Sequence, residues 1–141
     1  MKKYVDIQIS GRHMRTDDLE GIAVNVSGNY YRDGAKHKVI YVESVEGEEA
    51  VIVNTMIIED NRFEIIKEGL TNSRMTFVSN GKRYKALYQT PFGDLDMETQ
   101  TRLLLVDMNE DQINVNLDYA LYLDGVHISD ANMYLHIAGA A

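Results

Sequence analysis

Hydrophobic and polar residues alternate along most of this chain with a period of two. Val5, Ile7 and Ile9 alternate with polar residues, and between 113 and 123 every second residue is large and apolar. Successive side chains of a β-strand point to opposite faces, so this period is typical of strands that bury one face. No stretch shows a convincing period of 3.6 residues. The pattern therefore predicts an all-β protein.

Turn signals divide the alternating runs at short intervals. Asp-Gly at 33–34 and 124–125 and Asn-Gly at 80–81 favour the positive φ angles of tight hairpins. Polar breaks at 45–50, 59–62 and 108–111 are of the same kind. We expect room for a helical turn only at 13–18. The predicted strands are 3–12, 19–32, 37–45, 50–59, 62–68, 73–79, 82–90, 93–108, 112–123 and 126–138.

The order of these strands predicts a barrel. Sequential strands joined by tight turns form an antiparallel up-and-down meander, and an open meander of this size leaves two unpaired edges. Closing the sheet removes both edges and buries one apolar face. A two-sheet sandwich is the rival, but it usually needs longer crossover connections. We predict one domain, residues 1–141, folded as a closed barrel of about 8–10 strands.

The only proline, Pro91, marks a corner in this predicted sheet. Proline cannot donate to a sheet ladder, and Gly93 follows it closely, as glycine does at bulges and bends. We therefore expect the chain to turn at Thr90-Pro91 and to continue as one long, coiled strand over 93–108. Along that strand the apolar parity slips, because both parities are apolar at 103–106.

The composition of the chain disfavours several classes of binding partner and chemistry. The net charge is −8, which disfavours nucleic acid and anionic membrane surfaces as partners. The chain has no cysteine, so disulfides and thiolate chemistry are excluded. The first residues lack the apolar run of a secretory signal, and no segment approaches the roughly 18 apolar residues of a membrane-spanning helix. We expect a cytoplasmic protein.

Four segments carry a resemblance to a known family. They are "NSRMTFVSNGKRY" at 72–84, "TPFGDLDMETQTRLL" at 90–104, "GNYYRDG" at 28–34 and "VIYVES" at 39–44. With these, the chain resembles the YwiB-like family of bacterial calycin barrels, whose function is unknown. A histidine often precedes the Thr-Pro-Phe-Gly unit in that family, and Gln89 stands there instead. The resemblance implies a lipocalin-like barrel and supplies no activity.

Motifs for metal or cofactor chemistry are weak. The histidines, at 13, 37, 127 and 136, are not at metal-ligand spacing, and segment 107–112 departs from a calcium loop at its sixth position. The row of Asp94, Asp96 and Glu98 has the spacing of a solvated outer face. No phosphate loop, nucleophile elbow or dinucleotide fingerprint is present. We expect no metal and no cofactor, and an enzyme is the less favoured class.

Glu43 is the most informative polar residue. It shares a strand parity with Val39 and Tyr41, so it would be buried if that side faces inward. A buried carboxylate needs a cation or several hydrogen-bond donors. Arg74 and Arg83 are the candidate cations. The favoured interpretation is a purely structural ion pair, or a Glu43 that faces water because Ile40 and Val42 point inward. The alternative is a polar cluster of Glu43, Arg74, Tyr41 and Tyr88 at one end of the barrel.

The first functional hypothesis is a non-enzymatic barrel that binds a small, largely apolar molecule in its lumen. A barrel of this size is wide enough either to be filled by side chains or to hold a ligand, and flexible methionines suit an adaptable cavity. The expected lining residues are Tyr41, Glu43, Arg74, Met75, Phe77, Tyr88, Met97 and Thr99.

Two other hypotheses belong to different classes. The second is a solid-core interaction module that acts through its outer surface or as a homodimer. It would expose an apolar patch, either at Ile40 and Val42 or at Leu104 and Val106. The third and least favoured is an enzyme that uses Glu43 with Arg74 on an unknown substrate.

Overall fold

The structure, a computed structural model, describes residues 1–15, 18–44, 47 and 50–140, without the side chains of 12–22. The described chain is all-β, and it contains no helix that is long and apolar enough to cross a membrane. Its strands are β1 (Tyr4–Arg15), β2 (Asp18–Asp33), β3 (Lys36–Ser44), β4 (Val51–Ile58), β5 (Phe63–Glu68), β6 (Asn72–Phe77), β7 (Arg83–Thr90), β8 (Gly93–Asp94), β9 (Met97–Met108), β10 (Gln112–Leu123) and β11 (Val126–Gly139).

Ten of these strands form a closed antiparallel ring. Each long strand pairs with its neighbours in sequence, β6 also pairs with β7, and β11 pairs with β1. The two-residue strand β8 pairs with β7 outside this ring. The predicted closed meander is therefore confirmed and the sandwich is wrong. Outside the segment predicted as 93–108, predicted strand ends differ from the observed ones by no more than three residues.

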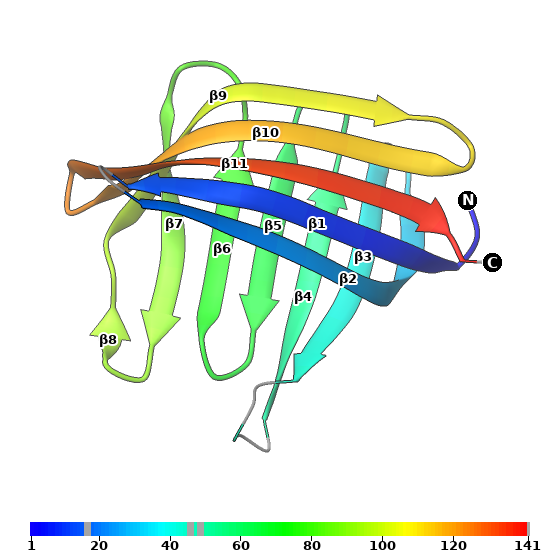
Figure 1. Cartoon of the computed structure of the whole chain (residues 1–141), viewed down its shortest axis with the longest axis horizontal. Helices are drawn as coiled ribbons and strands as arrows, with labels where there is room; N and C mark the ends of the chain where they lie inside the picture. The colour runs from blue at the N-terminus through cyan, green and yellow to red at the C-terminus, as the bar shows by residue number, and fades with distance from the viewer. Residues whose placement is uncertain (16–17, 45–46, 48–49, 141) are drawn as a thin grey trace.

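The barrel has two walls whose strands cross steeply. In Figure 1, β9, β10, β11, β1 and β2 run across the view, while β3 to β7 stand behind them at a large angle. In the described chain, β2 pairs with β3 only over Asn29–Asp33, although β2 pairs with β1 from Asp18 onward. The walls therefore join along a short seam and diverge beyond it.

Gly28 lies at the point where the walls diverge. A Cβ atom there would lie 2.6 Å from the carbonyl oxygen of Ile40 and 2.9 Å from Cδ1 of Ile7. No larger side chain fits between β1, β2 and β3 at this position without a backbone shift. The small residue therefore lets β2 cross close to β3 before the two strands separate.

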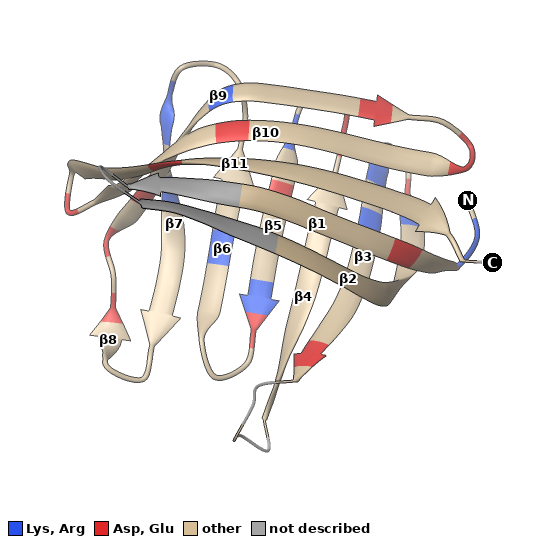
Figure 2. Cartoon of the chain, viewed as in Figure 1, with Lys and Arg blue, Asp and Glu red and all other residues tan. Residues whose placement is uncertain are grey.

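The core fills only one end of the barrel. Phe63 and Phe77 stack with ring centroids 5.9 Å apart, and Tyr119 lies 4.8 Å from Phe77 on the opposite wall. Charged residues of both signs are interspersed over the strands and turns around it (Figure 2). The largest fully buried side chains are Phe63, Phe77, Ile7, Met56, Ile58, Ile113, Leu117, Leu135, Ile137, Val5, Val39 and Val115.

A β-bulge at Arg102 explains the slip of parity in β9. Asp118 of β10 pairs with Leu103 and the next residue, Tyr119, pairs with Thr101, so Arg102 is an extra residue. Before the bulge the odd-numbered residues face inward, and after it the even-numbered ones do. Leu104 and Val106 consequently pack against the core, and the prediction that they form an exposed patch is wrong.

The corner at Thr90-Pro91 is confirmed, but the long strand after it is not. The Thr90 hydroxyl donates to the Gly93 carbonyl at 2.8 Å and accepts from the Phe92 amide at 3.2 Å. Gly93 has φ of 125°, a conformation that favours glycine. The predicted strand 93–108 is divided into β8 and β9.

The helical turn predicted for 13–18 is wrong where the structure can test it. Residues 13–15 continue β1, and residue 18 begins β2. Residues 16–17 lie outside the described residues. The described backbone is therefore extended up to residue 15 and again from residue 18.

Candidate functional site

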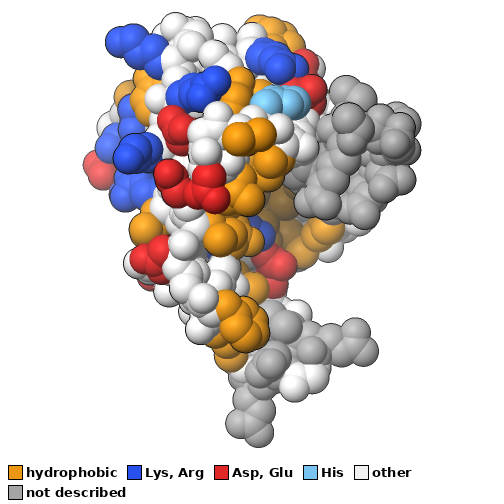
Figure 3. Space-filling model, turned by 90° about the vertical axis from the view of Figure 1, so that its left-hand side faces the viewer, with side chains coloured by type: hydrophobic (Ala, Val, Ile, Leu, Met, Phe, Trp, Pro, Cys, Tyr) orange, Lys and Arg blue, Asp and Glu red, His pale blue; other side chains and the backbone are white. Residues whose placement is uncertain are grey.

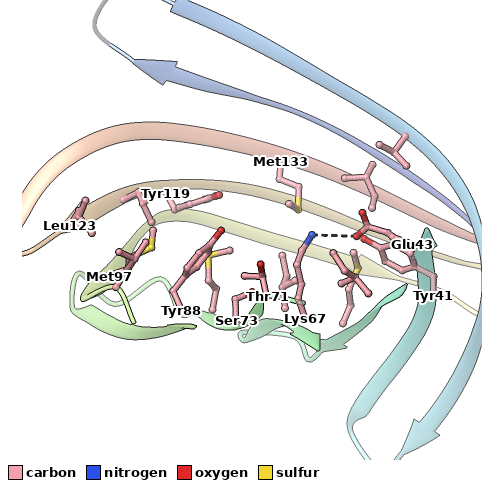
Figure 4. A pocket seen from close by; sticks show the side chains of 18 of the residues that line it. Tyr41, Glu43, Lys67, Thr71, Ser73, Tyr88, Met97, Tyr119, Leu123 and Met133 are labelled. Carbon is pink, nitrogen blue, oxygen red and sulfur yellow. Dashed lines mark hydrogen bonds and ion pairs between the residues drawn. The ribbon is translucent and has the colours of Figure 1, made fainter. Parts of the chain in front are cut away.

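Beyond the packed core, the lumen holds a cavity of about 750 Å³. Figure 3 views the barrel from the left-hand side of Figure 1 and shows hydrophobic side chains around a hollow in the middle of that face. Figure 4 shows side chains of both walls directed into the cavity. The lining residues are Ile9, Val24, Tyr41, Glu43, Ile52, Met56, Ile65, Lys67, Thr71, Ser73, Met75, Tyr88, Leu95, Met97, Tyr119, Leu121, Leu123, Ile128 and Met133.

Five polar residues form one continuous row on the wall built from β3 to β7. Tyr41 pairs with Asn54, Asn54 with Lys67, Lys67 with Ser73, and Ser73 with Tyr88. Residues opposite one another in neighbouring strands point to the same face of the sheet. This row, the polar belt, therefore lies at one level on the inner face. The next row toward the core is apolar and consists of Val39, Met56, Ile65 and Met75.

An ion pair lies beside the polar belt. Glu43 Oε1 accepts a hydrogen bond from Asn54 Nδ2 at 2.6 Å and lies 3.3 Å from Lys67 Nζ. The side chains of Glu43 and Lys67 are each 38% exposed, whereas Asn54 is fully buried. Burial, together with the negative charge of Glu43, raises the pKa of Tyr41 to about 12. At neutral pH Tyr41 therefore keeps its proton. The formal charges of Glu43 and Lys67 cancel each other.

The opposite wall presents apolar side chains to the same cavity. They come from β1, β2, the segment before β9, and β9 to β11, and Tyr119 at the inner end is the exception. Burial raises the pKa of the Tyr119 hydroxyl. Ile128 enters the cavity because β11 has a register shift there: Leu121 pairs with Ser129 and Tyr122 pairs with His127. This inward position breaks the alternation of β11.

Comparisons with known proteins agree with this barrel. Residues 7–135 match the model of a domain of unknown function, DUF1934. The chain belongs to the DUF1934 family. It is 24% identical over 139 residues to the uncharacterized β-barrel protein YwiB of Bacillus subtilis (strain 168), covering 96% of this chain and 92% of that protein. The crystal structure of YwiB superposes with a TM-score of 0.86 at 18% identity, over 99% of this chain and 93% of the other.

Within this DUF1934 barrel, five of the eight predicted lining residues reach the cavity: Tyr41, Glu43, Met75, Tyr88 and Met97. Phe77 and Thr99 do face inward, but they are fully buried. Phe77 belongs to the packed core, and the Thr99 hydroxyl donates to the Thr76 carbonyl at 2.9 Å. The predicted set of lining residues therefore included two residues, Phe77 and Thr99, that lie in the filled part of the barrel.

The predicted pairing of Glu43 with Arg74 is wrong. Arg74 lies between the inward residues Ser73 and Met75, so its side chain points outward and is 54% exposed. It binds Glu64 at 2.9 Å, and Arg62 binds the same carboxylate at 2.7 Å. The geometry required for an enzyme that uses Glu43 with Arg74 is therefore missing.

Sequence reasoning also missed Lys67, the actual cation beside Glu43. The sequence did contain a sign that Lys67 points inward, because Lys67 shares the inward parity of Phe63 and Ile65 in a short strand. Ser73 was missed as well, since a small hydroxyl residue carries little patterning information. Both lie in the polar belt.

The other polar segments have local roles in the described chain. His37 hydrogen bonds with the Tyr30 hydroxyl at 2.6 Å, His127 with Asp130 at 2.8 Å and His136 with Asn114 at 2.6 Å. The side chain of His13 lies outside the described residues. No group of three or more His, Cys, Asp or Glu residues in the described chain is arranged to hold a metal ion.

The two acidic segments are also accounted for. At 107–112 the chain makes the β9–β10 turn, where Asn109 Oδ1 accepts from the amides of Asp111 and Gln112. In the outer row, Asp94 and Asp96 are exposed, as expected of a solvated face. Glu98, the third member of the row, is half-buried.

Proposed function

We propose that this protein binds a small, largely apolar molecule in the half-filled lumen of its barrel and does not act as an enzyme. The observation that carries the proposal is the cavity of about 750 Å³ between the two walls. Small-molecule sites are typically concave, largely apolar and roughly 300–1,000 Å³ in volume, with a few polar groups that orient the ligand. The cavity has each of these properties.

The composition of the lining supports the same function. Apolar surface in contact with water is unfavourable, so an apolar ligand that displaces this water gains free energy. Met56, Met75, Met97 and Met133 contribute flexible thioethers that adapt to different shapes. The lack of cysteine fits a ligand met in the reducing cytoplasm. A calycin-like carrier is the corresponding biological class, by analogy of fold alone.

Filling the cavity from within tests the proposal. Met133→Trp adds a large ring on the apolar wall, where Figure 4 shows Met133 directed into the cavity. Leu105→Trp is the matched control, because Leu105 is 57% exposed on the outside of β9. We expect Nile red, a neutral apolar dye, to bind the wild type and the control, and to bind Met133→Trp at least tenfold more weakly.

A second readout uses the natural ligand. Native mass spectrometry of the protein purified from its own host is expected to show an additional bound mass, which Met133→Trp lowers and Leu105→Trp leaves in place. Absence of both a bound species and dye binding would refute the proposal. Equal dye affinity in the two tryptophan variants would place the binding outside the lumen and also refute it.

The alternative is a module that acts through its outer surface or as a homodimer. Its support is that Val42 is 56% exposed and Phe92 is 100% exposed, although Ile40 is half-buried. Light scattering gives the decisive measurement. Dimers that become monomers in Val42→Lys or Phe92→Lys would favour this alternative, and a wild-type monomer would remove the homodimer.

A further inference from the structure

The distribution of polar groups over the cavity specifies the ligand further. We infer that the bound molecule is facially amphipathic, with hydrogen-bonding groups along one face and an apolar opposite face. This inference rests on the proposed function and deepens it. It differs from binding of a fatty acid or another molecule whose polar group is confined to one end.

The asymmetry of the two walls is the first observation. Seven cavity-lining residues carry polar groups, and six of them belong to the wall of β3 to β7: Tyr41, Glu43, Lys67, Thr71, Ser73 and Tyr88. Among the lining residues whose side chains the structure describes, Tyr119 is the only polar one on the other wall, and it lies at the inner end against Phe77. A ligand between the walls therefore contacts hydrogen-bonding groups on one side and hydrocarbon on the other.

The spacing of the polar belt is the second observation. Its members occupy directly paired positions on five neighbouring strands, from Tyr41 on β3 to Tyr88 on β7. Neighbouring strands lie roughly 4.8 Å apart, so the row extends over about 19 Å. One carboxylate or hydroxyl cannot reach groups so far apart. A ligand with several polar groups along one face matches the row.

The hydrogen-bonding capacity of the belt is the third observation. Lys67 forms one ion pair, to Glu43, and keeps further N–H donors. No described residue forms a hydrogen bond with the side-chain hydroxyl of Ser73 or Tyr88. Figure 4 shows the Tyr88 hydroxyl pointing into the cavity. Because Glu43 and Lys67 neutralise each other, uncharged hydroxyl or carbonyl groups suit the belt better than carboxylates or phosphates.

Two epimeric bile acids provide matched probes. Chenodeoxycholate and ursodeoxycholate have the same atoms, the same apolar body and the same terminal carboxylate. In chenodeoxycholate both hydroxyls lie on one face, whereas in ursodeoxycholate they lie on opposite faces. Competition against Nile red is expected to show three- to tenfold tighter binding of chenodeoxycholate, which is about the effect of one hydrogen bond.

Variants connect this preference to the belt. The double variant Ser73→Ala, Tyr88→Phe removes two hydroxyls with little change of shape and should bring the two affinities within twofold of each other. Tyr134→Phe is the matched control, because it removes an exposed hydroxyl outside the cavity, and it should keep the preference. Nile red binding by each variant shows that its fold is intact.

The outcomes separate the inference from the function on which it rests. If neither the dye nor either bile acid binds, the proposed function fails. If the dye binds but the epimers compete equally, or ursodeoxycholate competes better, facial recognition is refuted and lumen binding stands. A preference that survives in the double variant would arise elsewhere than the belt, and the inference would be overturned.

Discussion

Replacing Asn54 with leucine should leave the stability of the barrel almost unchanged. Asn54 is fully buried, and its Oδ1 has no hydrogen-bond partner among the described residues. A buried acceptor without a partner costs about 1–3 kcal/mol. Leucine has a similar size and removes this penalty. We predict that the free energy of unfolding of Asn54→Leu stays within about 1 kcal/mol of the wild-type value.

The small expected change in stability follows from the hydrogen bond that Asn54→Leu removes and the unpaired acceptor that it also removes. The Nδ2 donor bonds the Glu43 carboxylate at 2.6 Å, and such a bond to a charged group contributes about 1.5–3 kcal/mol. Glu43 is 38% exposed and keeps Lys67 at 3.3 Å, so water and the ammonium group still solvate it. The lost bond and the relieved penalty are therefore of similar size, and they nearly cancel.

Urea denaturation at pH 7 measures this difference, with Leu117→Ala as the reference. Leu117 is also fully buried, and its truncation leaves a cavity in the packed end, which typically costs about 2–5 kcal/mol. A loss above about 2 kcal/mol in Asn54→Leu would refute the reasoning, because the buried amide would then be strongly stabilising. A neutral result would indicate that Asn54 is more useful for holding Glu43 at the cavity than for stability.

Two further predictions concern the outer wall and the bulge. Burial would raise the pKa of Glu64, but the hydrogen bonds and charges of two arginines outweigh it and lower that pKa below 4.5. Glu64→Gln should therefore lower the free energy of unfolding by about 1–2 kcal/mol at pH 7. This loss should shrink as the pH falls below 4.5, because the wild-type carboxylate is then protonated. Equal losses at pH 7 and pH 3 in urea titrations would contradict this prediction. Deleting Arg102 removes only the bulge and an exposed ion pair to Asp130, so we expect a loss of about 1 kcal/mol. Deleting Leu105 instead turns the inward residues after it outward and should cost at least about 3 kcal/mol; similar melting temperatures for the two deletions would argue against the assigned register.

Most of the fold was predictable because its connections are local. Alternation places each strand, and a turn such as Asp-Gly at 124–125 fixes the pairing of the strands on either side. Closure also follows, since a meander of this length otherwise exposes two edges. The main error came at β9, where apolar residues occupy both parities at 103–106 and local pattern cannot locate the extra residue at Arg102.

The site was predictable only in part, because it depends on register between strands distant in sequence. Parity left the orientation of Glu43 open between the lumen and solvent, and it did not identify the cation. Arg74 and Lys67 are both basic residues in strands near β3, and a difference of one residue in parity decides that Lys67 points inward and Arg74 outward. Positions within the lumen are harder still, since Phe77 and Met75 share a face and only Met75 reaches the cavity.

The polar belt has a simpler explanation, which can be tested against the structure. A row of polar residues would also occur where water enters a barrel, without any ligand. Such an entrance would be polar on every side, because all of its lining would meet water. Here the facing lining residues include Ile9, Leu121 and Met133, while Tyr41, Lys67 and Ser73 belong to the belt. Exposing hydrocarbon to a permanently hydrated cavity costs free energy that a uniformly polar lining avoids. The one-sided arrangement is therefore better explained by a molecule with two unlike faces than by water alone.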